Sequence, residues 1–156
     1  MMTHDSLMEL TKDLPMKQID VNGAGYLQRY FVGEDAGGQT WLHRFLTADA
    51  ERHVHSHPWV GTSMILCGKY TEHLRKRTGL PHMPFTDRTR YFAPGEVNQI
   101  WPETLHRIIE VEPDTWTLLH IKPGRQPTWS FFDDGGNEIV MQSSPEDWHK
   151  NFGVRQ

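Results

Sequence analysis

The chain has 156 residues, and 16 Lys and Arg stand against 20 Asp and Glu, for a formal net charge of −4. This length fits one domain, so we expect a single domain over residues 1–156. The acidic balance gives no electrostatic reason to bind nucleic acid or a membrane surface. One cysteine excludes a disulfide framework, and no apolar run approaches the roughly 20 residues of a membrane span. Because no secretion signal is recognisable, we expect a cytoplasmic protein.

Helical signals are confined to the two ends of the chain. Asp5 or Ser6 can cap a short helix over about residues 5–14, which Pro15 ends. Near the other end, a serine, a proline and two acidic residues in succession predict a short helix over about residues 145–151. The core of the domain is therefore expected between them, over about residues 26–141.

The segments between these helices are short, rich in aromatic and β-branched residues, and separated by Gly and Pro. The basic, Pro-containing stretch 75–90 is expected to be a loop. Strands at intervals of about 8 to 12 residues, with no helices between them, are typical of an antiparallel sandwich or barrel. The sequence therefore predicts an all-β domain, whose exposed edges favour a homodimer through a strand such as 26–32. The predicted strands are 26–32, 40–45, 53–57, 62–66, 69–75, 90–92, 97–101, 106–111, 116–121, 128–132 and 139–141.

Histidine is the over-represented residue, with ten copies, and three of them alternate in the run His53-Val-His55-Ser-His57. Side chains alternate faces along a strand, so these three can project to one side. Two imidazoles at this spacing can bind one metal ion, with a third ligand from elsewhere in the fold. A polar face exposed to solvent is the alternative interpretation of the same run.

The spacings around this run resemble the two motifs of the cupin superfamily. Gly68 lies eleven residues after His57, as in the first motif, and His106 lies eleven residues after Gly95, as in the second. The resemblance implies an antiparallel double-stranded β-helix, the jelly-roll or cupin barrel, with short terminal helices. It also implies that His55, His57 and His106 are ligands of a divalent metal ion.

The resemblance covers about residues 41–121, where the chain also looks like a group of small bacterial cupins, and it departs from the motifs at several positions. The glutamate of the first motif falls at Gly61 or Thr62, and neither residue is a usual metal ligand. Thiol dioxygenases are cupins that also lack this glutamate, and they use three histidines with ferrous iron. The resemblance therefore favours Fe(II), with Zn, Mn or Ni as alternatives.

Glu72 is a candidate fourth ligand, because it lies four residues past Gly68 on a strand that can return toward the same interior. The alternative is an exposed carboxylate paired with Arg75 or Lys69. His53 is an alternative to one of the two paired histidines, although the spacing to Gly68 favours the other two.

A small β-barrel interior holds either packed side chains or one small ligand. A buried serine there needs a polar partner, an inward arginine can bind a carboxylate, and aromatic rings can form walls. Each aromatic side chain can equally be plain core packing. His43 and His120 are expected to lie in flanking strands as hydrogen-bonding residues. The candidates for substrate binding are Ser63, Tyr70, Arg75 and Trp101.

Three functions fit this sequence. The first is a non-haem Fe(II) oxygenase, a dioxygenase-type oxidoreductase that acts on a small organic substrate. The second is a metal-dependent isomerase, epimerase or lyase on a similar scaffold. The third is a cupin that binds a small molecule without catalysing a reaction. A shared scaffold does not choose among them, because one fold hosts many chemistries.

Overall fold

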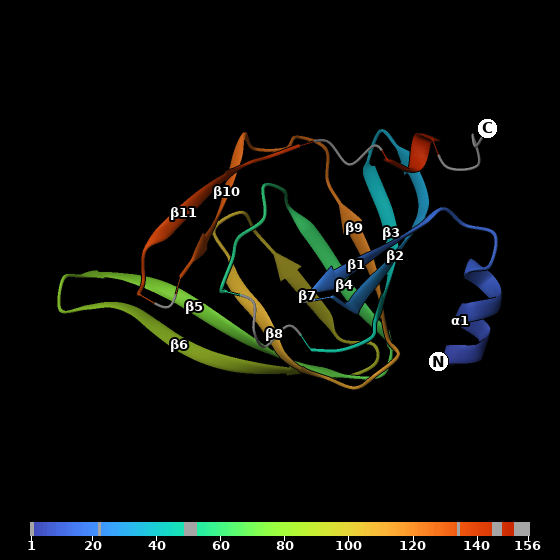
Figure 1. Cartoon of the computed structure of the whole chain (residues 1–156), viewed down its shortest axis with the longest axis horizontal. Helices are drawn as coiled ribbons and strands as arrows, with labels where there is room; N and C mark the ends of the chain where they lie inside the picture. The colour runs from blue at the N-terminus through green and yellow to red at the C-terminus, as the bar shows by residue number, and fades with distance from the viewer. Residues whose placement is uncertain (1, 22, 49–52, 134, 145–147, 152–156) are drawn as a thin grey trace.

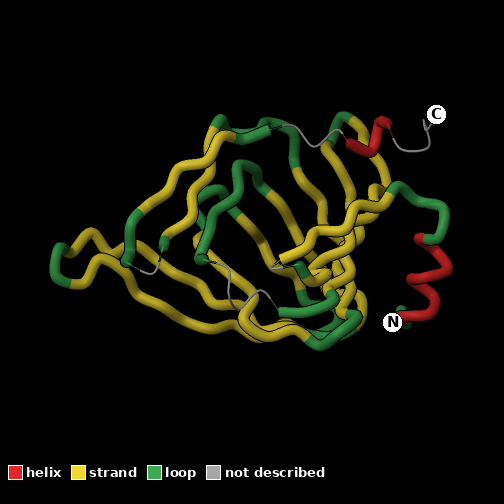
Figure 2. The backbone as a smooth tube through the Cα atoms, in the orientation of Figure 1, coloured by secondary structure: helices red, strands yellow, loops and turns green. Residues whose placement is uncertain are grey.

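The computed structural model shows an antiparallel β-barrel with one α-helix outside it, and describes residues 2–21, 23–48, 53–133, 135–144 and 148–151 (Figure 1). Strands dominate the chain and loops are short (Figure 2). None of the helices in these residues is long and apolar enough to cross a membrane.

Six strands form the larger sheet, in the order β1-β2-β3-β9-β4-β7. Every neighbouring pair is antiparallel. Because side chains alternate along each strand, one face of this sheet points into the barrel and the other points out. The strands are β1 (Met16–Val21), β2 (Ala24–Asp35), β3 (Gly38–Phe45), β4 (Gly61–Cys67), β7 (Val97–Ile100) and β9 (Thr115–Ile121).

The opposite wall of the barrel consists of a three-stranded sheet, in the order β6-β5-β8, and a β10–β11 hairpin. A short extended segment around His55 connects them, through bridges to His106 of β8 and Phe131 of β10. Figure 1 shows the β5–β6 hairpin extending well beyond the barrel. The strands are β5 (Tyr70–Leu80), β6 (Met83–Phe92), β8 (Leu105–Val111), β10 (Thr128–Phe132) and β11 (Glu138–Gln142).

Helix α1 (His4–Thr11) covers the outer face of the larger sheet. A Thr3–Ser6 capping box starts it, and its fully buried Leu7 packs with Tyr30, Leu42 and Trp116. The Trp116 indole also donates a hydrogen bond to His4 Nδ1 at 3.0 Å. Since apolar side chains cover this outer face, the polar residues that alternate with them point into the barrel.

The all-β jelly-roll prediction is confirmed, and most predicted strands are present within a few residues of their expected bounds. The loop predicted over 75–90 is wrong: it forms most of the β5–β6 hairpin, which Asp87 stabilises through contacts with Arg75 and His73. Residues 53–57 make only an isolated bridge at His55 instead of the predicted strand. Strand β1 was not predicted.

The ends of the chain also differ from expectation. The first helix spans His4–Thr11 instead of 5–14. Of the helix expected over 145–151, residues 145–147 lie outside the described residues, and Trp148–Asn151 form a short 3-10 helix. Segment 26–32 lies in an inner strand of the larger sheet, because β2 pairs with β1 on one side and β3 on the other, and a homodimer stays a prediction.

Gly68 and Gly95 provide a matched test of what the motif glycines do. Both have positive φ, +82° and +88°, but a Cβ on Gly68 would lie 2.8 Å from Thr115 Cα, whereas a Cβ on Gly95 meets nothing within 4 Å. We expect Gly95→Ala to lower the free energy of unfolding by about 1 kcal/mol, from backbone strain alone. Gly68→Ala should cost about 2–4 kcal/mol, because overpacking adds to that strain. Urea unfolding of both variants measures the difference, and equal losses would contradict this explanation.

Candidate metal centre

A backbone bridge brings two of the predicted histidines together. His55 N–H donates to His106 C=O and His106 N–H donates to His55 C=O, both at 3.0 Å. Residues bridged directly opposite each other present their side chains on the same face, a few ångströms apart. His57, two residues beyond His55, returns to that face. The backbone therefore positions three imidazoles before any metal ion is considered.

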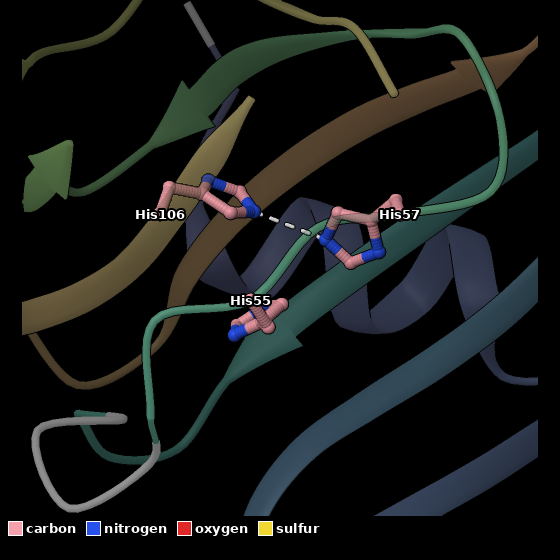
Figure 3. Close-up of side chains that lie close together, drawn as sticks. All are labelled: His55, His57 and His106. Carbon is pink, nitrogen blue, oxygen red and sulfur yellow. Dashed lines mark hydrogen bonds between the residues drawn. The ribbon is translucent and has the colours of Figure 1, made fainter. Parts of the chain in front are cut away.

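The three rings form a nearly equilateral triangle, shown in Figure 3. Their centroids are 5.1 Å apart for His55–His57, 5.0 Å for His55–His106 and 5.1 Å for His57–His106. One nitrogen from each ring lies within 4.8 Å of the others, a grouping that can hold a metal ion. His57 Nε2 and His106 Nε2 are 3.0 Å apart. Two imidazole nitrogens bound at right angles, each about 2.1 Å from one ion, are also about 3 Å apart.

Hydrogen bonds fix which nitrogen of two rings carries a proton. His55 Nδ1 lies 3.0 Å from the backbone oxygen of His53, and His106 Nδ1 contacts Glu72 Oε1. Both oxygens accept, so each Nδ1–H donates and each Nε2 keeps its lone pair. Partners of this kind orient metal-binding histidines and increase their basicity. The donor set therefore fits a divalent metal ion.

Glu72 acts on His106 from behind the cluster. Its side chain is 1% exposed, and Oε1 accepts both from His106 Nδ1 and from Asn98 Nδ2 at 3.1 Å. Asn98 Nδ2 also contacts the Tyr70 hydroxyl at 3.1 Å. Burial, followed by the charge of Glu72, raises the pKa of Tyr70, so that hydroxyl stays protonated. Within the described residues the metal-binding group contains the three histidines and not Glu72, so the structure does not reproduce the fourth-ligand hypothesis.

The three histidines open onto a cavity of about 210 Å³ inside the barrel. Ser63 and Tyr70, both candidates from the sequence, line it. Trp59 forms another wall and stacks on His57 with a centroid separation of 4.4 Å. Leucine, isoleucine and phenylalanine side chains complete the lining, so polar groups face a largely apolar space.

Two other sequence candidates for substrate binding, Arg75 and Trp101, lie outside this cavity. Arg75 pairs with Asp87 on the β5–β6 hairpin, and Trp101 is 51% exposed. Both border a separate open groove. His53 does not join the cluster, because its ring stacks flat on Phe131 at 5.5 Å. His120 alternates with Leu119 and Ile121 of the barrel interior, so it faces outward.

Arg29 and Asn98 were not predicted from the sequence, and His43 was expected only as a flanking residue. Strand register places Arg29 opposite His43, and Arg29 Nε donates to His43 Nε2 at 3.2 Å. Both line the cavity. Burial, and then the Arg29 charge, lower the pKa of His43 well below its usual 6.5. The available signal for Arg29 and His43 was the alternation of polar residues with buried apolar residues along 26–32 and 40–45.

Comparison of the sequence with protein-family models and with curated proteins gives no match. Solved structures do match. A cupin-2 domain protein from Rhodospirillum rubrum aligns with a TM-score of 0.56 and 13% identity, over 79% of this chain and 78% of its own. Oxalate decarboxylase from B. subtilis aligns with a TM-score of 0.53 and 14% identity, over 85% and 31%. This chain has the cupin fold.

Two further cupin-fold matches were solved with iron. Streptomyces albus HEPD, with substrate 2-hydroxyethylphosphonate and Fe(II) bound, aligns with a TM-score of 0.54 and 14% identity over 72% of this chain. Fe(II)-HppE with an alternative substrate aligns with a TM-score of 0.51 and 8% identity, also over 72%. The chain spans 25% of the length of the first protein and 57% of the second.

The missing glutamate of the first cupin motif has a steric explanation. A Cβ on Gly61, one of the two positions at which that glutamate can fall, would lie 2.6 Å from the Trp59 ring. Trp59 therefore occupies the space that a larger side chain needs, and stacks on His57 there.

We expect Glu72→Gln to weaken the binding of a divalent metal by about 10- to 100-fold, because the amide loses the charge that strengthens His106 as a donor. Competition titration with a Zn²⁺ chelator measures the effect. Glu110→Gln is the matched control, because Glu110 is an exposed glutamate on β8. Equal Zn²⁺ affinity in the wild type and Glu72→Gln would show that Glu72 does not support the site.

His43 should make the metal-free protein less stable in acid. Its folded pKa is lowered, so below pH 6.5 the unfolded chain binds a proton that the folded chain does not. The free energy of unfolding therefore falls as pH decreases from 6.5 and is recovered above it, with a slope of at most about 1.4 kcal/mol per pH unit. Urea unfolding between pH 7.5 and 5.5 should show a smaller slope for His43→Gln. The same change at exposed His82 should leave the slope unaltered.

Proposed function

We propose that this cupin is a metal-dependent enzyme in which His55, His57 and His106 hold Fe(II), and that it oxidises a small organic substrate with dioxygen. The observation that carries the proposal is the cluster of three imidazoles opening onto an internal cavity. Three histidine ligands leave coordination positions open for substrate and dioxygen.

The chain's own residues have distinct tasks in this proposal. Glu72 and the His53 carbonyl hold two rings with Nε2 toward the ion. Trp59 restrains the third ring by stacking. The apolar part of the lining lowers the polarity around a bound substrate, which strengthens its polar contacts. Ser63 and Tyr70 supply hydroxyl groups at the cavity wall for orienting that substrate.

Iron is favoured over other divalent ions for two reasons. Imidazole ligands suit Fe, Zn, Cu and Ni, so the donor set is compatible with iron. HEPD and HppE, which share this fold, were solved with Fe(II). Bound Fe(II) would supply adjacent positions for dioxygen and substrate and a route for electrons between them. In a dioxygenase reaction the organic substrate provides all the electrons, so no second reductant is required.

A metal-dependent isomerase or lyase is the second candidate, and His43 favours it. This ring lines the cavity and its lowered pKa keeps it neutral at pH 7, and a neutral imidazole N–H can polarise a substrate carbonyl. The two functions differ in oxygen demand: an oxygenase consumes dioxygen in step with substrate, and an isomerase or lyase turns over equally well without it.

The first test is metal loading without an affinity tag. We expect the wild type to bind one Fe(II) per chain under anaerobic conditions and to give a nitrosyl EPR signal with nitric oxide. His106→Ala should lose at least about 100-fold in affinity, because one of three ligands is removed from the site. Binding should also decrease near pH 5–6, where protons compete for imidazole.

His82→Ala is the control, since this exposed histidine lies in the turn between β5 and β6. It should bind iron as the wild type does. Circular dichroism should show an unchanged β-sheet spectrum for both variants. Stoichiometric iron in His106→Ala, at wild-type affinity, would mean that the ligand set is wrong.

A further inference from the structure

Strand β11 is an open edge of its sheet, and all of its side chains are exposed. It spans Glu138–Gln142, and among the described residues it pairs with β10 alone. Three consecutive apolar residues, Ile139, Val140 and Met141, are 37%, 57% and 38% exposed. Figure 1 shows the β10–β11 hairpin at the periphery of the molecule. The N–H and C=O groups along the outer side of such a strand can pair with a strand of another chain.

The other open edges carry features that prevent such pairing. Within the described residues these edges are β1, β6 and β7. β1 contains Lys17 and a bulge at Asp20. β6 contains Pro84 and Arg88, and β7 is only four residues long. Charges, prolines, bulges and short length each protect an edge. From Ile139 onward β11 has no charge, proline or bulge, so it is the least protected of these edges.

The sequence of β11 is complementary to itself in one antiparallel register. When two copies pair about a two-fold axis at Val140, Ile139 lies opposite Met141 of the second copy. Glu138 then lies opposite Gln142, whose amide can donate to the carboxylate, and no like charges meet. Parallel pairing in register would instead place Glu138 against Glu138. A two-fold axis repeats every contact and closes the assembly at two copies.

The same register extends the side-chain rows of the β10–β11 hairpin. Trp129 lies opposite Met141 and Phe131 lies opposite Ile139, and both aromatic side chains are half-buried. Residues directly opposite each other share a face, so each row continues into the second copy. Each row then contains Trp129, Met141 and, from the second copy, Ile139 and Phe131. Pairing therefore adds backbone hydrogen bonds and buries apolar surface that β11 exposes.

We infer that two copies of this chain associate through their β11 strands and join their β10–β11 hairpins into one four-stranded antiparallel sheet. The inference goes beyond the proposed function and does not depend on a bound metal. A strand of five residues is about 17 Å long, so the contact is smaller than that of a permanent dimer. We therefore expect a Kd on the order of 10 µM.

Sedimentation velocity of the full chain, from about 1 to 500 µM, tests this inference. The wild type should shift from the mass of one 18.2 kDa chain toward that of two. Val140→Lys should associate at least about 100-fold more weakly, because two ammonium groups would face each other at the two-fold axis. Val97→Lys is the matched control: this valine is 51% exposed on edge strand β7, and the variant should associate as the wild type does. Circular dichroism should show an unchanged β-sheet spectrum for both variants.

A mixture of two further variants tests the register. Ile139→Lys and Met141→Glu should each associate more weakly than the wild type. Because residue 139 of one copy faces residue 141 of the other, an equimolar mixture should recover association through one ion pair between the substituted positions. Hydrogen exchange keeps the test usable if a variant folds poorly: in the wild type, the amides of Glu138–Gln142 should exchange more slowly as protein concentration increases.

Several results would overturn the inference. A wild type that stays monomeric up to about 500 µM would show that β11 does not pair with a second copy. Wild-type association in Val140→Lys, or its loss in Val97→Lys, would place the contact on another surface. A mixture of Ile139→Lys and Met141→Glu that associates no better than either variant alone would refute the antiparallel pairing.

Discussion

The pair of backbone hydrogen bonds between His55 and His106 is the constraint on which the site depends. It joins the segment before β4 to β8, and together with the His55–Phe131 bridge it connects the β6-β5-β8 sheet to the β10–β11 hairpin. The same two bonds therefore close one wall of the barrel and align two imidazoles. Ligand position is set by the backbone, which leaves only ring orientation to be fixed by side-chain contacts.

Ring orientation is fixed by a buried polar chain that runs from Tyr70 through Asn98 and Glu72 to His106. Its members come from three strands, β5, β7 and β8, so the chain also ties the two walls of the barrel together. Buried polar groups are costly unless they are hydrogen-bonded. A change at any of these residues should therefore affect both the packing of the barrel and the geometry of the site.

The strands and the paired histidines could be predicted because both depend on short-range patterns: alternation with a period of two, and Gly and Pro between strands, are visible in the sequence. His106 was predicted only through the resemblance to the second cupin motif, because it lies 49 residues from His57. The β5–β6 hairpin was missed because its charged residues resemble a loop; their pairing, as between Arg75 and Asp87, becomes apparent only across two strands.

The polar groups around the cluster depend on register, which a single sequence does not reveal. Arg29 meets His43 only because β2 and β3 pair in one particular alignment. Glu72 was predicted near the site, but the sequence could not show that it contacts His106, because the choice between binding a metal and binding His106 depends on a few ångströms. Arg75 and Trp101 were selected for residue type alone, and residue type does not specify on which face a side chain lies.

The 3.0 Å contact between His57 Nε2 and His106 Nε2 has a consequence for assembly of the centre. Because Glu72 keeps the His106 proton on Nδ1, the proton shared by the two Nε2 atoms belongs to His57. A metal ion at that nitrogen requires the proton to move to His57 Nδ1, so loading changes the tautomer of one ring while the other two rings are already oriented. Because the site is preorganised, the barrel can form before it takes up metal. The free energy of metal binding then contributes to affinity and is not needed for ordering the chain.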